Sequence, residues 1–369
     1  MNTRERFHAT CNFEKPDRPI RWETIGYWTE TIARWHKEGL PETVMDNAFT
    51  GPDHFGFDKM NWLTITVGAD SEPGFAPLFD IEIIEETDKH ILKKDHAGKT
   101  IKTHIEGQSG LPQDLDNPVK TMADFEALKW RLDPETPERF TANLDIMINL
   151  ANAGGDNSFN SAVCCGLFGT YRHLMGLVGM SVLMKKEPKL LHAIAENWVY
   201  MHETLFKKLR EKSIIDYIYF WEDMSYKNGP MISPKAFREF MSPYYKRLID
   251  SLKADTDIRV FSVDSDGNLW ALLELFSEVG INMFLPFEVQ AGMDIREVRE
   301  KFPKMIIWGG IDKMALFDNN EFIEKEVMEK VPPVLKSGGF IPAIDHLIPP
   351  EVSLKNYEKF LEIVRGIKY

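Results

Sequence analysis

Short apolar segments alternate with longer segments of helical periodicity along the second half of the chain. Each apolar segment ends in polar residues, and an amphipathic stretch follows it. Five such segments occur, at residues 216–221, 258–263, 282–287, 304–308 and 339–344. This alternation predicts a parallel sheet whose strands are joined by crossover helices.

Helix-start signals separate these segments and support the same pattern. Ser233 precedes Pro234, as expected for an N-cap followed by the first helical residue. Asp294 stands three residues before Glu297, which is the spacing of a capping box, and Ser353 is placed to cap the last helix. Five consecutive strand–helix units are therefore predicted.

The first half of the chain is less regular. Segments 19–25 and 160–165 are expected to be strands of the same sheet, and 61–67 is the weakest candidate for the eighth strand. Segments 79–84, 90–94 and 100–104, with a turn at Gly98, predict an antiparallel hairpin insertion at roughly 79–105. Residues 114–139 are predicted to form a loop and a short helix. The fold class is therefore α/β, with residues 1–369 forming a single (β/α)8 TIM barrel that carries this insertion.

Composition is that of an ordinary soluble globular protein. The chain is 43% hydrophobic and 27% charged, with a formal net charge of −13. This acidic balance argues against binding to nucleic acid or to an anionic membrane. The start of the chain has no apolar signal region, so a cytoplasmic location is expected. The oligomeric state stays open, with a homodimer as one option.

The three cysteines give no sign of a disulfide framework or a thiolate zinc site. They are Cys11, Cys164 and Cys165, and no CxxC motif occurs. Adjacent cysteines seldom bridge each other, so reduced thiols in the core are expected. The most apolar helical stretch, 166–184, contains Arg172 and His173 and is too interrupted to span a bilayer.

Acidic side chains follow most of the predicted strands. In a barrel of this type, catalytic groups project from the carboxyl ends of several strands into one mouth. The residues at such positions are Glu222, Asp223, Asp264, Asp266, Glu288, Asp312, Lys313, Asp345 and His346. We expect them to face one another across a mouth on the order of 10 Å wide.

So many carboxylates in one opening require a positive partner, which would be a divalent metal or a cationic ligand. One histidine with two or three carboxylates matches a catalytic Zn²⁺ site. The predicted metal ligands are Asp264, Asp266, Glu288 and His346, and the predicted catalytic residues are Glu222, Asp264 and Asp312. The structural alternatives are turns or helix caps for the two aspartates and a structural role for the histidine.

Five segments of the chain resemble a known family. They are 221–230, 264–267, 286–294, 309–313 and 338–350. From about residue 16 onward the chain resembles the uroporphyrinogen decarboxylase superfamily of (β/α)8 barrels. That superfamily includes zinc-dependent methyltransferases that supply methyl groups to corrinoid proteins.

Two departures from the family pattern bear on function. The decarboxylases carry an arginine-rich signature that grips the carboxylates of their substrate, whereas 21–28 here reads RWETIGYW. Uroporphyrinogen is therefore not the expected substrate. The corrinoid methyltransferases bind zinc through His-x-Cys and a later Cys, and the corresponding positions here are Asp264, Asp266 and His346. Oxygen and nitrogen ligands would still hold Zn²⁺ and leave it a stronger Lewis acid.

The resemblance implies a zinc-dependent methyltransferase of the O-demethylase type. Its methyl donor would be a methoxylated small molecule, and its acceptor the Co(I) of a corrinoid carried by a separate partner protein. The predicted substrate-binding residues are Trp22, Tyr27, Trp28 and Phe220 as cup lining, and Arg172 or Lys313 as the carboxylate partner.

Two alternatives to methyl transfer remain. One is a decarboxylase-like lyase acting on a non-tetrapyrrole carboxylate, in which Asp264 and Glu222 handle protons. The other is a non-catalytic barrel that binds a ligand or partner in its mouth.

Overall fold

The core of the fold is one curled parallel sheet. The computed structural model describes residues 1–23, 25–45, 50–65, 72–104, 112–317 and 319–369. The sheet has seven strands in the order β1-β6-β7-β10-β11-β12-β13, and all neighbouring pairs are parallel. The strands are β1 (Lys59–Thr64), β6 (Ser158–Cys165), β7 (Tyr217–Trp221), β10 (Val260–Asp264), β11 (Met283–Leu285), β12 (Ile306–Trp308) and β13 (Phe340–Ile341). Their spatial order follows the chain order, as predicted for consecutive strand–helix units.

The strand predicted at 19–25 is not regular. Residue 24 of this segment lies outside the described residues, and its other residues form no assigned strand. The Asp58 N–H donates to the Arg21 carbonyl at 2.9 Å, next to β1. Beyond β13, Tyr27 forms an isolated parallel bridge with Ile348, whose N–H donates to Gly26 at 2.8 Å. Irregular chain therefore lies next to the start of β1 and beyond the end of β13, and a barrel of eight regular strands is not what the structure shows.

The weakest strand candidate proved to be real. The prediction at 61–67 corresponds to β1, which starts two residues earlier, and residues 66 and 67 lie outside the described part of the chain. It pairs with β6 over six positions, from Lys59 opposite Ser158 to Thr64 opposite Val163.

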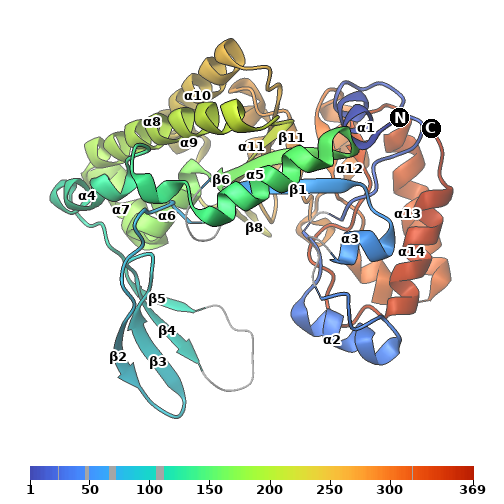
Figure 1. Cartoon of the computed structure of the whole chain (residues 1–369), viewed down its shortest axis with the longest axis horizontal. Helices are drawn as coiled ribbons and strands as arrows, with labels where there is room; N and C mark the ends of the chain where they lie inside the picture. Colours follow the sequence, from blue (N-terminus) through green and yellow to red (C-terminus); the bar gives the residue numbers. More distant parts are fainter. Residues whose placement is uncertain (24, 46–49, 66–71, 105–111, 318) are drawn as a thin grey trace.

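Helices cover the outside of the sheet (Figure 1). They are α5 (Ala142–Gly154), α6 (Leu167–Met175), α7 (Leu177–Lys186), α8 (Pro188–Lys212), α9 (Pro234–Phe240), α10 (Ser242–Asp255), α11 (Trp270–Glu278), α12 (Ile295–Lys301), α13 (Asn320–Leu335) and α14 (Leu354–Gly366). Ser233 and Ser353 cap α9 and α14 as predicted. Asp294 caps α12 by accepting from the Arg296 N–H. In the described chain, no helix has both the length and the apolar character needed to cross a bilayer.

Two apolar cores lie on the two faces of the sheet. The inner core fills the curl of the sheet. Helix α1 (Thr3–Cys11) covers the end of this core at which the strands begin, where the Phe7 ring stacks on Phe159 at 4.5 Å between centroids. The outer core lies between the sheet and the helices. Successive residues of a strand enter opposite cores, so Tyr219 belongs to the inner core and Phe220 to the outer one. The three cysteines are buried and unbridged.

A buried carboxylate, Asp58, holds the N-terminal segment against the start of β1. Asp58 is 3% exposed and accepts hydrogen bonds from Arg6 Nη1 at 2.8 Å and from Arg18 Nη1 at 2.7 Å. Burial acts to raise the pKa of Asp58, but the bonds from Arg18 and from the Arg21 N–H outweigh it and lower that pKa. This ion cluster ties the N-terminal segment to the start of β1.

A separate antiparallel sheet projects from the body of the molecule (Figure 1). Its strands are β2 (Glu82–Glu86), β3 (His90–Lys94), β4 (Thr100–His104) and β5 (Gln113–Asp116), in that order. The predicted hairpin insertion at 79–105 was too short, because β5 adds a fourth strand to this sheet. Residues 105–111, between β4 and β5, lie outside the described residues. The sequence Gln-Asp-Leu-Asp of β5 has low strand propensity and therefore predicts a loop rather than the observed strand. The short helix predicted beyond it is α4 (Met122–Leu128).

Candidate functional site

Three predicted metal ligands meet at the carboxyl ends of the strands. Asp266 follows β10, Glu288 follows β11, and His346 lies beyond β13. One ligand atom from each lies within 4.8 Å of the other two, and all three side chains are partly exposed. His346 Nε2 is 3.2 Å from Asp266 Oδ2. We call these three residues the acidic–histidine group.

The local backbone fixes this group. The Gly267 N–H donates to Glu288 Oε2 at 2.9 Å, which joins the turn after β10 to the turn after β11. Gly267 has φ of +80°, and a Cβ there would lie 2.6 Å from the Ser225 carbonyl oxygen of the short strand β8 (Ser225–Tyr226). Only glycine suits this position, because other residues rarely adopt such a φ and the space is occupied.

The donor set fits a zinc ion. Zinc is bound by imidazole nitrogen and carboxylate oxygen, and a catalytic zinc site has three protein ligands and an open fourth position. Ligands about 2.0–2.2 Å from one ion lie roughly 3–4 Å apart. Atoms within 4.8 Å of one another therefore need only small side-chain shifts to share an ion.

Neighbouring charges shift the pKa of His346. Burial alone would lower the pKa of His346, but the hydrogen bond and charge of Asp266, with the charge of Glu288, raise that pKa overall. Lys313 Nζ lies 3.5 Å from Glu288 Oε1 and 3.4 Å from Asp345 Oδ1. Asp345 is fully buried, and burial raises its pKa. The ammonium group of Lys313 is thus already shared by two carboxylates.

Asp264 lies apart from the acidic–histidine group. It ends β10, is 7% exposed and accepts a hydrogen bond from the Tyr219 hydroxyl. Burial, followed by the charge of Asp266, raises the pKa of Asp264 well above its ordinary value. In the described chain its carboxylate is not among the atoms that could share one ion, so its predicted ligation has no support in this geometry. Its predicted catalytic role stays a prediction.

Glu222 is fully buried and anchors a helix. Its carboxylate accepts from the Leu167 N–H at 3.1 Å, the Gly169 N–H at 2.9 Å and the Tyr245 hydroxyl at 2.5 Å. Gly166 leaves room for it, since a Cβ there would lie 2.3 Å from Glu222 Cδ. Burial raises the pKa of Glu222 to about 7. Its oxygens satisfy the first N–H groups of α6, which argues for a structural rather than the predicted catalytic role.

Asp312, the third predicted catalytic residue, is partly exposed just beyond β12. Its carboxylate accepts from Gln290 Nε2 and from the Met314 N–H, both at 2.9 Å. The second bond is typical of an aspartate that stabilises its own turn. A catalytic role for Asp312 stays a prediction.

Two of the predicted cup aromatics do not line the opening. Phe220 packs outward against the rings of Tyr245 and Trp198, at 5.2 and 5.9 Å between centroids. It does so because it alternates with the inward-facing Tyr219. Tyr27 is 8% exposed in the outer core, where its hydroxyl is 3.2 Å from that of Tyr357.

The other two aromatics are placed differently. Trp22 is buried in the inner core, and Trp28 is 38% exposed at the start of α2 (Thr29–Glu38). Neither is hydrogen-bonded or ion-paired to the acidic–histidine group in the described structure, and their predicted roles stay predictions.

The sequence reasoning missed three aromatics close to the strand ends. Trp221 ends β7 directly beside Asp264 in the register, and Tyr219 lies two residues before it on the same face. The Trp62 and Tyr219 rings pack edge to face at 4.7 Å. Strand alternation counted back from Asp264 would have identified Tyr219 and Trp221 in place of Phe220.

Arg172 of α6 reaches the same opening. Its Nη1 donates to the Asp223 carbonyl at 2.9 Å and to Asp223 Oδ2 at 3.1 Å. Its guanidinium carbon lies 4.9 Å from the centre of the Trp221 ring. Burial, opposed by Arg172 and assisted by the charges of Asp266 and Glu288, raises the pKa of Asp223. The Arg172–Asp223 pair is therefore within electrostatic reach of the acidic–histidine group.

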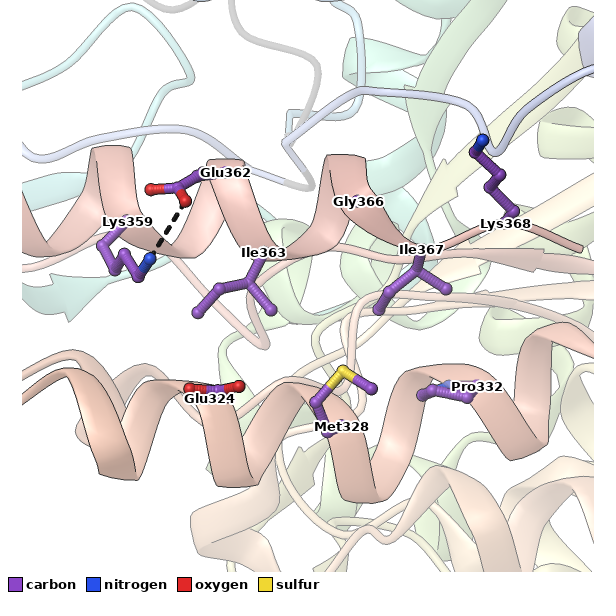
Figure 2. Close-up of a pocket in the computed structure, with 9 residues that line it drawn as sticks. All are labelled: Glu324, Met328, Pro332, Lys359, Glu362, Ile363, Gly366, Ile367 and Lys368. Atoms are coloured by element: carbon purple, nitrogen blue, oxygen red, sulfur yellow. Dashed lines mark hydrogen bonds and ion pairs between the residues drawn. The ribbon is translucent and has the colours of Figure 1, made fainter.

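A hollow elsewhere on the surface takes no part in this site. Figure 2 shows it between α13 and α14, where Met328, Ile363 and Ile367 point into it and Lys359 pairs with Glu362 at 3.0 Å. None of the predicted site residues lines this hollow.

Comparison with known proteins shows similarity to one enzyme family. A family model described as "Uroporphyrinogen decarboxylase (URO-D)" matches residues 100–367. Uroporphyrinogen decarboxylase of Prochlorococcus marinus (strain MIT 9312) is 25% identical over 280 residues, which cover 69% of this chain and 72% of that protein. The enzyme of Hordeum vulgare is 29% identical over 142 residues, covering 37% of this chain and 41% of that relative. The chloroplastic enzyme of Nicotiana tabacum is 26% identical over 194 residues, covering 50% and 44%. The matches thus span less than half the length of these two plant relatives.

A solved structure shares the fold. A methyltransferase from Methanosarcina mazei superposes with a TM-score of 0.67 at 15% sequence identity, covering 99% of this chain and 98% of the other. At this identity the similarity establishes a common fold and nothing further.

Proposed function

The chain belongs to the uroporphyrinogen decarboxylase family, and within it we propose that the protein is a zinc-dependent methyltransferase. The proposed reaction moves a methyl group from a methoxylated small molecule to the Co(I) centre of a separate corrinoid protein. The observation that carries the proposal is the meeting of Asp266, Glu288 and His346 at one edge of the sheet.

Decarboxylation of a tetrapyrrole polyanion fits the opening poorly. Asp223, Asp266 and Glu288 present carboxylates there. Where the decarboxylases carry their arginine-rich signature, Glu23 is buried and accepts from the Ile344 N–H at 2.8 Å and from the Tyr357 hydroxyl at 3.1 Å. A substrate with many carboxylates would meet like charges, which destabilise binding.

In the proposed mechanism, Asp266, Glu288 and His346 would hold the zinc. Bound zinc would supply Lewis-acid stabilisation of negative charge on the oxygen that loses its methyl group. Lys313 keeps Glu288 and Asp345 in place by contacting both. Asp264 accepts a hydrogen bond from the Tyr219 hydroxyl, and burial raises its pKa, which opposes a further negative charge beside the group.

A second candidate is a lyase acting on a non-tetrapyrrole carboxylate. The raised pKa of Asp264 favours it, because a protonated carboxyl at this edge could deliver a proton to the carbon that loses CO₂. Such a reaction would need neither zinc nor a corrinoid partner.

Metal content and activity separate the two candidates. We expect the purified protein to bind zinc with a stoichiometry of about one per chain, the number set by one four-coordinate site. His346→Ala should lower zinc affinity by at least roughly tenfold, because even loss of a supporting outer ligand costs that much. His8→Ala is the matched control, since His8 lies 2.7 Å from Asp216 at the opposite end of the sheet.

Methyl transfer from methoxylated compounds to added cob(I)alamin is followed by the change in absorbance as the cob(I)alamin becomes methylated. Equal zinc binding by both variants would contradict the metal site. Decarboxylation of a small carboxylate by the zinc-stripped protein would favour the lyase.

A further inference from the structure

Arg172 has hydrogen-bonding capacity that the described part of the chain does not use. Both of its bonds leave from Nη1 and end on Asp223. The edge formed by Nε and Nη2 makes no hydrogen bond there, and the side chain is 23% exposed. This edge presents two parallel N–H groups, the geometry that grips a carboxylate with two hydrogen bonds.

Lys313, the other predicted carboxylate partner, is already occupied. Its ammonium group lies 3.5 Å from Glu288 and 3.4 Å from Asp345. A third carboxylate there would add repulsion and gain little from a shared cation. Of the two predicted carboxylate partners, Arg172 is therefore the one that keeps an unused pair of N–H groups in the described structure.

Trp221 gives the site a flat apolar wall. Its ring supports the guanidinium at 4.9 Å and follows Tyr219 on the inward face of β7. Tyr219 in turn packs edge to face with Trp62. A planar group attached to the bound carboxylate would have aromatic rings to stack on, which adds to binding by itself.

Asp223 sets the position of Arg172 relative to the acidic–histidine group. Asp223 has φ of +41°, unusual for a non-glycine residue, and it contacts Arg172 through both backbone and side chain. The charges of Asp266 and Glu288 act on the same carboxyl group. One ligand could thus extend from Arg172 toward the acidic–histidine group.

We propose that Arg172 and Trp221 form an anion-binding subsite that selects substrates bearing a carboxylate on a planar aromatic or conjugated group. The inference rests on the proposed function only where it calls that substrate the methyl donor. It makes Arg172 a specificity-determining residue and assigns Asp223 the positioning of its guanidinium.

The test compares benzoate with benzamide, which has nearly the same shape but no charge. Binding of each to the full chain is measured by isothermal titration calorimetry. We expect benzoate to bind at least about tenfold more tightly than benzamide, because charge-assisted bidentate bonds are worth that much or more.

Arg172→Gln should weaken benzoate binding by about tenfold to a hundredfold and leave benzamide binding unchanged. Arg172→Lys, which keeps the charge but loses the planar fork, should fall between the two. Arg247→Gln is the matched control, because Arg247 also pairs with a carboxylate, Glu196 at 2.6 Å, and packs on an aromatic ring, Tyr244 at 5.7 Å.

Several outcomes would overturn the subsite. They are equal binding of benzoate and benzamide by the wild type, no benzoate binding, or the same loss in the Arg247 and Arg172 variants. The wild-type comparison decides even if a variant fails to fold. None of these measurements needs zinc or cobalt, so loss of the subsite with methyl transfer intact would refute this inference alone. Benzoate selectivity in a protein that binds no zinc would refute the proposed function and leave the subsite standing.

Discussion

Replacing Glu222 by glutamine removes a buried carboxyl group whose pKa in the folded state is raised by burial from 4.5 to about 7. Below pH 4.5 this carboxyl is protonated in both the folded and unfolded chains. Between pH 4.5 and 7 the unfolded chain ionises while the folded chain keeps its proton, so the wild-type free energy of unfolding falls as pH rises. The raised pKa corresponds to about 3 kcal/mol of stability that is lost across this window.

The measurement is a series of urea unfolding curves for the wild type and the Glu222→Gln variant between pH 4.5 and 7. The glutamine NH₂ would face the Gly169 N–H, so the variant starts with a pH-independent deficit of about 1–3 kcal/mol. The free energy of unfolding of the wild type should therefore fall by about 3 kcal/mol relative to the variant as pH rises, so that the difference vanishes or changes sign near pH 7.

Glu203→Gln is the control. Bonds from Lys207 and Ser251 lower the pKa of Glu203, so its contribution is complete above its ordinary pKa and is lost only as pH falls below it. The difference between the wild type and this variant should therefore stay flat across the window. A constant difference between the wild type and Glu222→Gln would refute the assignment of Glu222 as a buried carboxyl that keeps its proton.

Two further substitutions test the packing that supports the site. Gly166→Ala should destabilise the fold by about 1–3 kcal/mol, because its Cβ would overlap the Glu222 carboxyl, whereas Gly366→Ala, with nothing within 4 Å of its Cβ, should be close to neutral in thermal unfolding. Asp58→Asn should cost about 3–5 kcal/mol, because it removes the charge of the buried carboxylate that pairs with both Arg6 and Arg18. Asp156→Asn, at an ion pair whose aspartate is 70% exposed, should cost less than about 1 kcal/mol in urea unfolding. Equal effects within either pair would contradict the burial argument.

The sequence predicted most of the sheet because its strands are continuous apolar runs that end in polar residues. This signal placed β7, β10, β11, β12 and β13 and ordered them correctly. It failed at 19–25, where the chain bonds to Asp58 next to β1 without forming a regular strand, and the next residues pair with Ile348 beyond β13. The pattern reports burial, and the hydrogen-bonded pairing that defines a strand depends on distant partners such as Asp58 and Ile348.

The candidate site was predicted in outline and not in detail. Strand-end position brought Asp266, Glu288 and His346 together, because parallel strands share one carboxyl edge. It could not tell that Glu222 turns away to satisfy α6, since that depends on N–H groups more than fifty residues earlier in the chain. Phe220 was predicted to line the opening, but side chains alternate along β7. Trp221, which pairs with Asp264, and Tyr219 share the inner face, so Phe220 lies on the outer face.

The outer strand of the projecting sheet has one further consequence. Strand β2 has a partner on only one side in the described sheet, and Ile83 and Ile84 are each 52% exposed beside that open edge. An edge of this kind can recruit a strand from another molecule. Glutamates make up three of its five residues, so two copies that approached edge to edge would bring like charges together. The register irregularity between Ile83 and Glu85 also interrupts a flat template. Both features oppose edge-to-edge pairing of two copies of the chain through β2, although Ile83 and Ile84 are exposed beside it.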